Sequence, residues 1–205
     1  MFVTFEGIEG SGKSTLLSGV AARLRANGRD PLVTREPGGT PVGDAIRGLF
    51  LNRSSSVAPL TEALLVNAAR AQHVADVIEP ALATGRTVLC DRFVDSTLAY
   101  QGYGRGLDRA ALQAMCDLAT AGIVPDLTFL LDVPVAVSRL RTRARGRDAD
   151  RLEAEDDAFH ERVRAGFLEL ARGPRHRVLD GRLDPDALLA EAMRALTARA
   201  GGTPE

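Results

Sequence analysis

The 205-residue sequence predicts a three-layer α/β protein, in which a five-stranded parallel sheet is flanked by helices. Short runs of apolar or β-branched residues alternate with longer amphipathic stretches, an order typical of βαβ units with right-handed crossovers. The short runs are apolar almost throughout, as in strands that are buried on both faces of a parallel sheet. The length suits one domain, so we expect residues 1–205 to form a single unit.

Five short runs are expected to form the strands, at residues 2–6, 31–34, 87–91, 127–132 and 177–179. Six amphipathic stretches are expected to form helices, at residues 14–27, 61–84, 109–121, 135–145, 157–172 and 185–200. The first three helices each end at a glycine, namely Gly28, Gly85 and Gly122, and glycine is the usual left-handed stop of a helix.

The composition argues against several classes of partner. The formal net charge is -1, which gives no bulk attraction to nucleic acid or to an acidic membrane surface. Cys90 and Cys116 each lie in an apolar stretch, which favours reduced thiols over a disulfide framework. No run approaches the roughly 18 apolar residues that a membrane span needs. We therefore expect a soluble, cytoplasmic protein without nucleic-acid or membrane partners.

A glycine-rich loop follows the first predicted strand and opens the first predicted helix. Residues 7–14 match G-x-x-x-x-G-K-[ST], the P-loop pattern, which points to a P-loop NTPase fold. Its glycines let several backbone N–H groups face one anion, and the helix N-terminus adds a partial positive charge. We expect the triphosphate to be bound by Gly7, Ile8, Glu9, Gly10, Ser11, Gly12, Lys13, Ser14 and Thr15.

Lys13 is the only lysine among the 26 basic residues, and the other 25 are arginines. An ammonium on a thin stem enters a narrow anion cradle more easily than a planar guanidinium does. We expect Lys13 to bridge the β- and γ-phosphates and the Ser14 hydroxyl to ligate Mg²⁺. Two strands end in a candidate for the second metal ligand. Asp91 is favoured because Arg92 places a cation beside the same site, whereas Asp132 can equally cap the following helix.

Three further segments become recognisable together with the P-loop. Residues 34–40 read Thr-Arg-Glu-Pro-Gly-Gly-Thr, and residues 91–102 read Asp-Arg-Phe-Val-Asp-Ser-Thr-Leu-Ala-Tyr-Gln-Gly. An arginine-rich interval at 143–153 follows the fourth predicted strand. This set closely resembles bacterial thymidylate kinases over essentially the whole chain. The resemblance implies transfer of the γ-phosphate of ATP to dTMP, giving dTDP and ADP for dTTP synthesis, with Mg²⁺ and in a homodimer.

The resemblance assigns the acceptor phosphate to Arg92, with Arg35 beside it, and a guanidinium fork matches a phosphate edge well. The attacking atom is itself a phosphate oxygen with a second pKa of about 6, so it is ionised at neutral pH and needs no general base. We expect catalysis to rest on alignment and charge stabilisation. The resemblance also places Glu9 near the sugar 3′-hydroxyl, and it includes Pro37 and Ser96 among the substrate-binding residues.

Gly10 stands where some members of the family carry an arginine, and members without it supply an arginine from a mobile lid. The resemblance thus implies a lid at about residues 141–153, which closes when both substrates are bound. Arg145 is the first candidate to reach the γ-phosphate. Arg147 and Arg151 come after it, and Arg143 completes the set.

By the same resemblance, the thymine and the deoxyribose are recognised by residues of two segments. Arg70 matches the arginine that hydrogen-bonds the thymine O4, and Thr97 approaches N3. Tyr100 matches the ring that leaves no room for a ribose 2′-hydroxyl, and Gln101 is a further substrate-binding candidate.

One position departs from the family's pattern. Members commonly place a phenylalanine four residues before the arginine that reads thymine, and here that residue is Val66. Valine offers no aromatic face, so the base is held by aliphatic contacts or by another ring. Phe93 and Tyr103 are the candidates.

Other activities are possible for a chain with a P-loop. A GTPase needs an N-K-x-D segment, which is excluded because the only lysine is Lys13. A nucleic-acid-dependent ATPase needs a basic, aromatic surface, and both features are weak here. The main alternative is a P-loop kinase for another nucleoside monophosphate or for a deoxynucleoside. A deoxynucleoside kinase needs a carboxylate base, for which Glu9 or Glu36 would have to serve.

Overall fold

The computed structural model describes residues 1–146 and 148–201. Its sheet has five parallel strands in the order β2-β3-β1-β4-β5, which confirms the predicted fold class. The strands are β1 (Phe2–Glu6), β2 (Leu32–Arg35), β3 (Val88–Asp91), β4 (Leu127–Asp132) and β5 (His176–Asp180). The predicted strands differ from these only at their ends.

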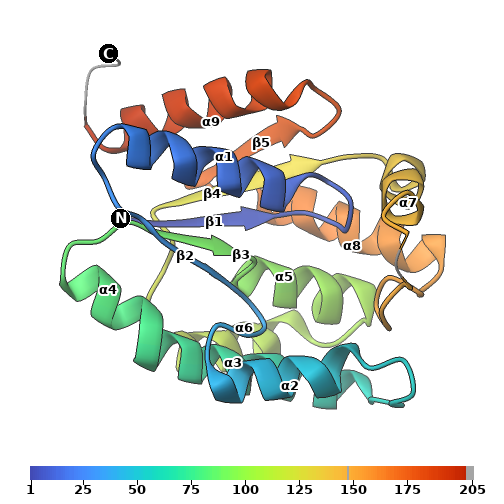
Figure 1. Cartoon of the computed structure of the whole chain (residues 1–205). Coiled ribbons are helices and arrows are strands. Elements are labelled where there is room, and N and C mark those ends of the chain that lie inside the picture. Colours follow the sequence, from blue (N-terminus) through green and yellow to red (C-terminus); the bar gives the residue numbers. More distant parts are fainter. Residues whose placement is uncertain (147, 202–205) are drawn as a thin grey trace.

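Helices lie on both faces of the sheet (Figure 1). The α-helices are α1 (Lys13–Ala26), α2 (Pro41–Leu51), α3 (Pro59–His73), α4 (Glu79–Ala83), α5 (Val94–Thr97), α6 (Arg109–Thr120), α7 (Val135–Arg143), α8 (Asp157–Leu170) and α9 (Pro185–Arg199). Two π-helical segments, η1 (Val74–Ile78) and η2 (Leu98–Gly104), continue α3 and α5. Within the described ranges, no helix is long and apolar enough to cross a membrane.

The core has two main parts because the side chains of each strand alternate between the faces of the sheet. On one face, Val3 and Phe5 of β1 pack with Leu16 of α1 and Leu188 of α9. On the other face, Phe2 of β1 packs with side chains of β3 and η1. The central strands β1, β3 and β4 therefore form the buried middle layer that the sequence predicts. The edge strands β2 and β5 are partly exposed, so the expectation of full burial is wrong for them.

The predicted helix at 61–84 is interrupted, and α2 was not predicted. The π-helical segment η1 lies directly before the start of α4, whose second residue is Pro80. Proline has no N–H to continue a helical ladder, which explains a change of hydrogen bonding here. Thr40 caps the N-terminus of α2, because its hydroxyl accepts from the Gly43 N–H. Pro41 occupies the first position of the helix, where proline is favoured.

Candidate active site

The segments with predicted chemistry meet at the carboxyl edge of the sheet. The glycine-rich loop follows β1, Asp91 ends β3, and Arg35 ends β2. Because β1 and β3 are neighbours and β3 pairs with β2, the three segments lie side by side. Ligands of parallel α/β sheets bind at this edge.

The glycine-rich loop is tightly fitted to β4. Gly7 has φ +136°, and a Cβ there would lie 2.5 Å from the Leu131 carbonyl oxygen. Within the loop, the Lys13 ammonium donates to the Gly7 and Ile8 carbonyls, at 3.0 Å each. Burial and the nearby Arg92 lower the pKa of Lys13 to about 8. A bound triphosphate would replace these carbonyls and favour the charged ammonium.

Ser14 and Asp91 are brought together as the metal prediction requires. The Ser14 hydroxyl donates to Oδ2 of Asp91 at 2.7 Å. Hydroxyl and carboxylate oxygens are the hard ligands that suit Mg²⁺ with its remaining waters. The competing Asp132 instead forms a bidentate pair with Arg164, at 2.7 and 2.8 Å. Its predicted role as a helix cap is wrong, since α7 has no side-chain cap.

Arg92 lies beside the loop in a strained conformation. Its φ of +73° falls in the left-handed region, which is uncommon for a residue with a Cβ and recurs at functional sites. Its Nη1 donates to the Gly7 carbonyl at 3.1 Å and to Ser96 Oγ at 3.0 Å. Its Nη2 donates to Glu9 at 2.7 Å and to the Tyr100 hydroxyl at 3.3 Å. These bonds use all four Nη protons, so a phosphate that accepts from Nη1 or Nη2 competes with these partners.

Glu9 faces Arg92 and is mostly buried. The Tyr100 hydroxyl donates to both of its oxygens, at 2.8 and 2.7 Å. Burial opposes ionisation of Glu9, but Arg92, Lys13 and the Tyr100 hydroxyl outweigh it and lower its pKa to about 2. Glu9 is thus an anion whose charge is already neutralised by Arg92.

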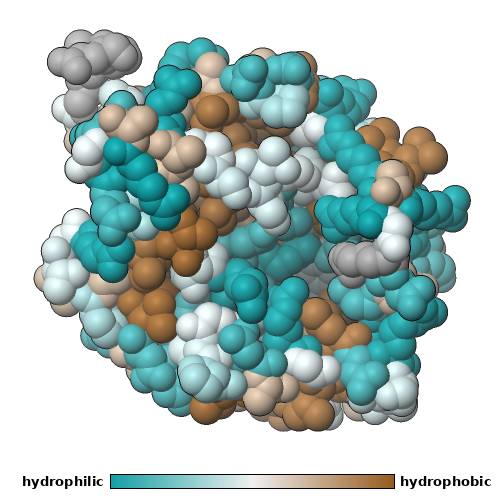
Figure 2. All heavy atoms as spheres, viewed as in Figure 1, coloured by the Kyte–Doolittle hydropathy of each residue, from teal (hydrophilic) through white to brown (hydrophobic). Residues whose placement is uncertain are grey.

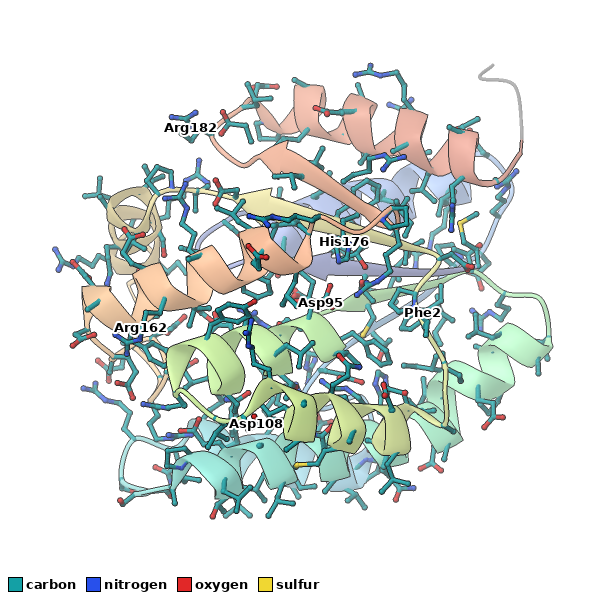
Figure 3. The ribbon with its side chains drawn as sticks, turned by 180° about the vertical axis from the view of Figure 1, so that it is seen from behind. Phe2, Asp95, Asp108, Arg162, His176 and Arg182 are labelled. Atoms are coloured by element: carbon teal, nitrogen blue, oxygen red, sulfur yellow. The ribbon has the colours of Figure 1, made fainter. Side chains whose placement is uncertain are left out.

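Glu6, the last residue of β1, contacts the segment that follows Arg92 and was not predicted as a site residue. The Ser96 hydroxyl donates to Glu6 at 2.6 Å and also accepts from Arg92. Burial and the nearby Asp95 raise the pKa of Glu6 to about 8. Asp95 pairs in turn with His176, with 2.8 Å between Oδ2 and Nε2, and the two residues lie close together on the far side of the sheet (Figure 3). The sequence signal for Glu6 is a carboxylate at the end of an apolar strand.

A charged cavity separates the glycine-rich loop from the segment that follows α7. Its lining contains five cations and five carboxylates, alongside Gly10 and Ser14, and Figure 2 shows a hydrophilic hollow in the middle of this face. The sequence did not predict Arg47 or Asp150 here. Burial, Arg35 and Arg92 lower the pKa of Arg47, as expected for a partly buried cation among other cations. The charged residues are Lys13, Arg35, Arg47, Arg92, Arg145, Glu9, Glu36, Asp91, Asp150 and Glu153.

The predicted lid arginines have different positions. Arg145 lines both the charged cavity and the neighbouring pocket beside the loop. Arg151 does not line the charged cavity. It donates instead to the buried Glu62 and to the Phe50 carbonyl. Arg143 is exposed at the end of α7, and Arg147 lies outside the described residues.

A second arginine of α7, Arg141, reaches the loop. It donates to the Gly181 carbonyl at 2.9 Å and to the Gly10 carbonyl at 3.3 Å. Gly10 has φ +72°, and a Cβ there would lie 2.8 Å from the Ser138 carbonyl oxygen. A side chain at position 10 would thus collide with α7. The pocket on this side of the loop is lined by Gly10, Ser11, Gly12, Thr15, Leu16, Gly19, Arg141, Arg145, Gly181, Leu183, Pro185, Asp186, Leu188 and Leu189.

A second pocket extends from Arg92 toward α3, and the predicted acceptor residues lie around it. Arg70 is almost fully buried, and all five N–H donors of its guanidinium already have partners. One of these partners is the Thr97 hydroxyl, at 3.0 Å. The lining residues are Glu9, Glu36, Pro37, Arg47, Phe50, Leu51, Val66, Arg70, Arg92, Phe93, Ser96, Thr97, Tyr100, Gln101, Asp150 and Leu152.

The pocket has aromatic walls despite Val66. Phe93 lines it, whereas Tyr103 does not; Arg109 donates to the Tyr103 hydroxyl away from the pocket. Phe50 of α2 also lines the pocket and was not predicted, because α2 itself was not. Phe50 and Phe93, together with the ring of Tyr100, therefore line the same pocket as Val66.

A P-loop beside a second cluster of cations, with a hydroxyl and a carboxylate that suit a metal ion, is typical of the class of P-loop nucleotide kinases. The family model described as thymidylate kinase matches residues 5–191. The chain is 54% identical to the thymidylate kinase of Geobacter sulfurreducens over 189 residues, 88% of each chain. It is 54% identical to that of Thermomicrobium roseum over 196 residues, which cover 95% of this chain and 92% of the relative.

A solved structure gives the same result. The crystal structure of thymidylate kinase from Ehrlichia chaffeensis superimposes with a TM-score of 0.77 at 34% identity, over 96% of this chain and 98% of that one. The chain belongs to the thymidylate kinase family.

Proposed function

We propose that this chain carries out its family's reaction, the transfer of the γ-phosphate of ATP to dTMP, with the site residues in the roles given below. The observation that carries these roles is the charged cavity, whose lining includes residues of the glycine-rich loop and Arg92. The loop offers a triphosphate cradle on one side, and Arg92 with Arg35 and Arg47 offers cations for a second phosphate on the other. Two polyanions can be held next to each other only where such cations offset their repulsion.

In this mechanism the chain aligns two phosphates and stabilises the charge that moves between them. The acceptor oxygen is already ionised, so Glu9 and Glu36 are not needed as bases. Lys13 and the loop N–H groups hold the donor phosphates. Ser14 and Asp91 would hold Mg²⁺, which supplies charge neutralisation to the donor phosphates. The two oxygens are 2.7 Å apart and face the same cavity, which supports this assignment.

Arg145 is the lid arginine that we assign to the transferred phosphoryl group, because it borders both the donor pocket and the charged cavity. The lid comprises about residues 141–153 of one domain. Arg141 helps to shape the adenosine side of the donor pocket through the Gly10 and Gly181 carbonyls.

The thymidine part of dTMP occupies the pocket that extends toward α3. Tyr100 excludes a ribose 2′-hydroxyl, and Phe50 and Phe93 supply the aromatic contacts that Val66 lacks. Arg70 now donates an N–H to the Thr97 hydroxyl. In the complex, the thymine O4 accepts that N–H in place of Thr97. Gln101 supports this wall by donating to Glu62 at 3.1 Å.

A coupled ADP-release assay with dTMP, dUMP, dCMP and thymidine tests the proposal. We expect turnover of dTMP, slower turnover of the other monophosphates and none of thymidine. Turnover of thymidine but not of dTMP would show a deoxynucleoside kinase and would contradict the roles of Arg92 and Glu9. No observation on the described residues favours that alternative.

The assembly we propose is a homodimer. Exposed apolar side chains gather on α2 and α3, which pack against each other, and hydrophobic atoms are visible along the lower edge of the molecule where α2 lies (Figure 2). They include Leu49 of α2 and Leu60 and Leu64 of α3, each more than half exposed. We place the protein in the cytoplasm, because both of its cysteines are free and buried, as suits a reducing compartment.

A further inference from the structure

A buried histidine beside Glu9 has no role in the reaction as described so far. His160 of α8 is 3% exposed, and its Nδ1 lies 4.0 Å from Oε2 of Glu9. Neither ring nitrogen of His160 has a hydrogen-bond partner among the described residues. Buried polar groups are nearly always hydrogen-bonded, so this imidazole calls for an explanation. A distance of 4.0 Å is too long for a hydrogen bond, yet a small approach would make one.

Binding of the acceptor changes the surroundings of Glu9, if Arg92 holds the acceptor phosphate as proposed above. The Glu9 carboxylate accepts hydrogen bonds from Arg92, at 2.7 Å, and from the Tyr100 hydroxyl. A dianionic phosphate competes with Glu9 for the same guanidinium. A mostly buried carboxylate that loses a cation needs another donor, because an unpaired buried charge is costly.

His160 can become this donor, because its Nδ1 lies 4.0 Å from Oε2 of Glu9 and has no other partner among the described residues. Burial lowers the pKa of His160 below its usual value, which favours the neutral ring. Glu9 on the loop, Asp157 on α8 and Glu155 before it favour the protonated ring, whereas Arg139 of α7 opposes it. Arg139 itself pairs with Asp157, at 2.8 Å.

The charged groups around His160 therefore act on its protonation in opposite directions. The Tyr100 hydroxyl, from η2, faces Glu9 rather than the ring. A dianion that draws Arg92 away from Glu9 adds negative charge near His160 and removes positive charge. Both changes favour protonation of the imidazole.

We propose that His160 is a positioning residue for Glu9: when the acceptor phosphate engages Arg92, His160 takes up a proton from solvent and donates an N–H···O hydrogen bond to the Glu9 carboxylate. Glu9 then keeps its orientation toward the sugar although Arg92 has been shared with the phosphate. Acceptor binding is coupled to the uptake of a proton.

Nuclear magnetic resonance of the wild-type protein tests this without any substitution. The chain has only three histidines, so long-range ¹H–¹⁵N spectra can resolve every imidazole from pH 5.5 to 8.5. We expect dTMP to raise the pKa of His160 by about one unit or more, which corresponds to a tenfold tighter hold on the proton. Thymidine has the same base and sugar but no phosphate, and it should leave the pKa unchanged.

Two results would overturn the role of His160, and a third would contradict the acceptor site on which it rests. A smaller rise with dTMP, or an equal rise with thymidine, overturns the role of His160. A spectrum that dTMP does not change at all contradicts instead the proposed acceptor site. Loss of dTMP binding in Arg92→Ala, with binding intact in the wild type, supports that site independently.

Two variants add a kinetic readout. Gln can donate an N–H to Glu9 without taking up a proton, whereas Phe has no donor. We expect His160→Phe to raise the KM for dTMP about tenfold, the usual effect of losing a hydrogen bond to a charged group. His160→Gln should restore most of that affinity and make the KM less dependent on pH than in the wild type, because only the ionisation of the phosphate itself, with a pKa of about 6, remains. Equal KM values for the two variants would overturn the proposal.

Discussion

Lys13 shows how one functional group is selected by its surroundings. Its ammonium is enclosed by the loop and already donates to two loop carbonyls, Gly7 and Ile8. The carbonyl at Gly7 also accepts from Arg92, so the loop is crowded with donors on its inner side. Little space is left for a planar guanidinium at this position.

We therefore expect Lys13→Arg to lower kcat by at least about a hundredfold, although the positive charge is kept. The measurement is steady-state ADP release with saturating dTMP. Arg194→Lys on the surface of α9 is the matched control, since it makes the opposite exchange away from the site. Activity of Lys13→Arg within a few-fold of wild type would contradict the steric argument.

Single residues divide clearly into those that the sequence predicted and those that it did not. Ser14, Asp91 and Arg92 stand in contiguous motifs, and the structure brings them together. Arg47 and His160 lie far from those motifs in the chain, and nothing local marks them. They belong to the site only because α2 and α8 fold back against the loop.

Arg151 illustrates why a position in a motif does not determine a role. The sequence places it in the lid among candidates for the γ-phosphate. In the structure, Arg151 and Arg105 both donate to Glu62, a fully buried carboxylate of α3, and Gln101 of η2 donates to it as well. Three elements are thereby joined at one side chain.

Glu62→Gln should loosen this junction, because two arginines lose their carboxylate partner. We expect a loss of about 3 kcal/mol in the free energy of unfolding, the lower end for breaking a buried ion pair, since both arginines keep some exposure. Hydrogen exchange of residues 148–156 should become faster. Glu169→Gln removes the exposed pair with Arg172 and should change stability by less than about 1 kcal/mol. Unchanged exchange at 148–156 would show that Glu62 does not anchor the lid.

The elements were predictable where clear start and stop signals bound them. The strands are short apolar runs, and the bounds of α1 and α9 agree with the predicted helices to within one residue. The segments missed were α2, α5 and η2, and the π-helical turn η1 inside the predicted helix 61–84 was not foreseen either. The Thr40-Pro41 pair is a recognisable helix start, so the sequence did contain a signal for α2.

The stability of the protein should depend on pH through Glu6. Its pKa is raised from 4.5 to about 8 in the folded chain, so the native state binds this proton more tightly than the unfolded chain does. The resulting stabilisation is complete below about pH 4.5 and is lost as the pH rises toward 8.

Glu6→Gln keeps the shape but cannot ionise, so it should gain stability relative to wild type between pH 5 and 8, at up to about 1.4 kcal/mol per pH unit. Urea unfolding at pH 5, 6, 7 and 8 measures the difference. A difference that stays constant across this range would mean that Glu6 is ionised in the folded protein.

The proposed homodimer predicts a change in molecular mass when its apolar surface is charged. Leu64→Glu places a carboxylate on the exposed face of α3, where burial in an interface would be costly. Sedimentation velocity should show monomers for this variant and dimers for wild type. Leu168→Glu, on α8, is the control and should remain dimeric. A wild-type monomer would refute the assembly, and a dimeric Leu64→Glu would place its interface elsewhere.

The single lysine has a practical meaning for chemical labelling. An amine-selective acylating reagent finds one side-chain amine in the sequence, and it sits inside the nucleotide cradle. Apart from the α-amino group, no other amine competes for the reagent. Mass spectrometry gives the fraction of chains that gain an acyl group at Lys13. This fraction therefore reports how often the glycine-rich loop leaves the Lys13 amine accessible to the reagent. The same scarcity means that lysine-to-lysine crosslinkers cannot bridge two side chains within one molecule.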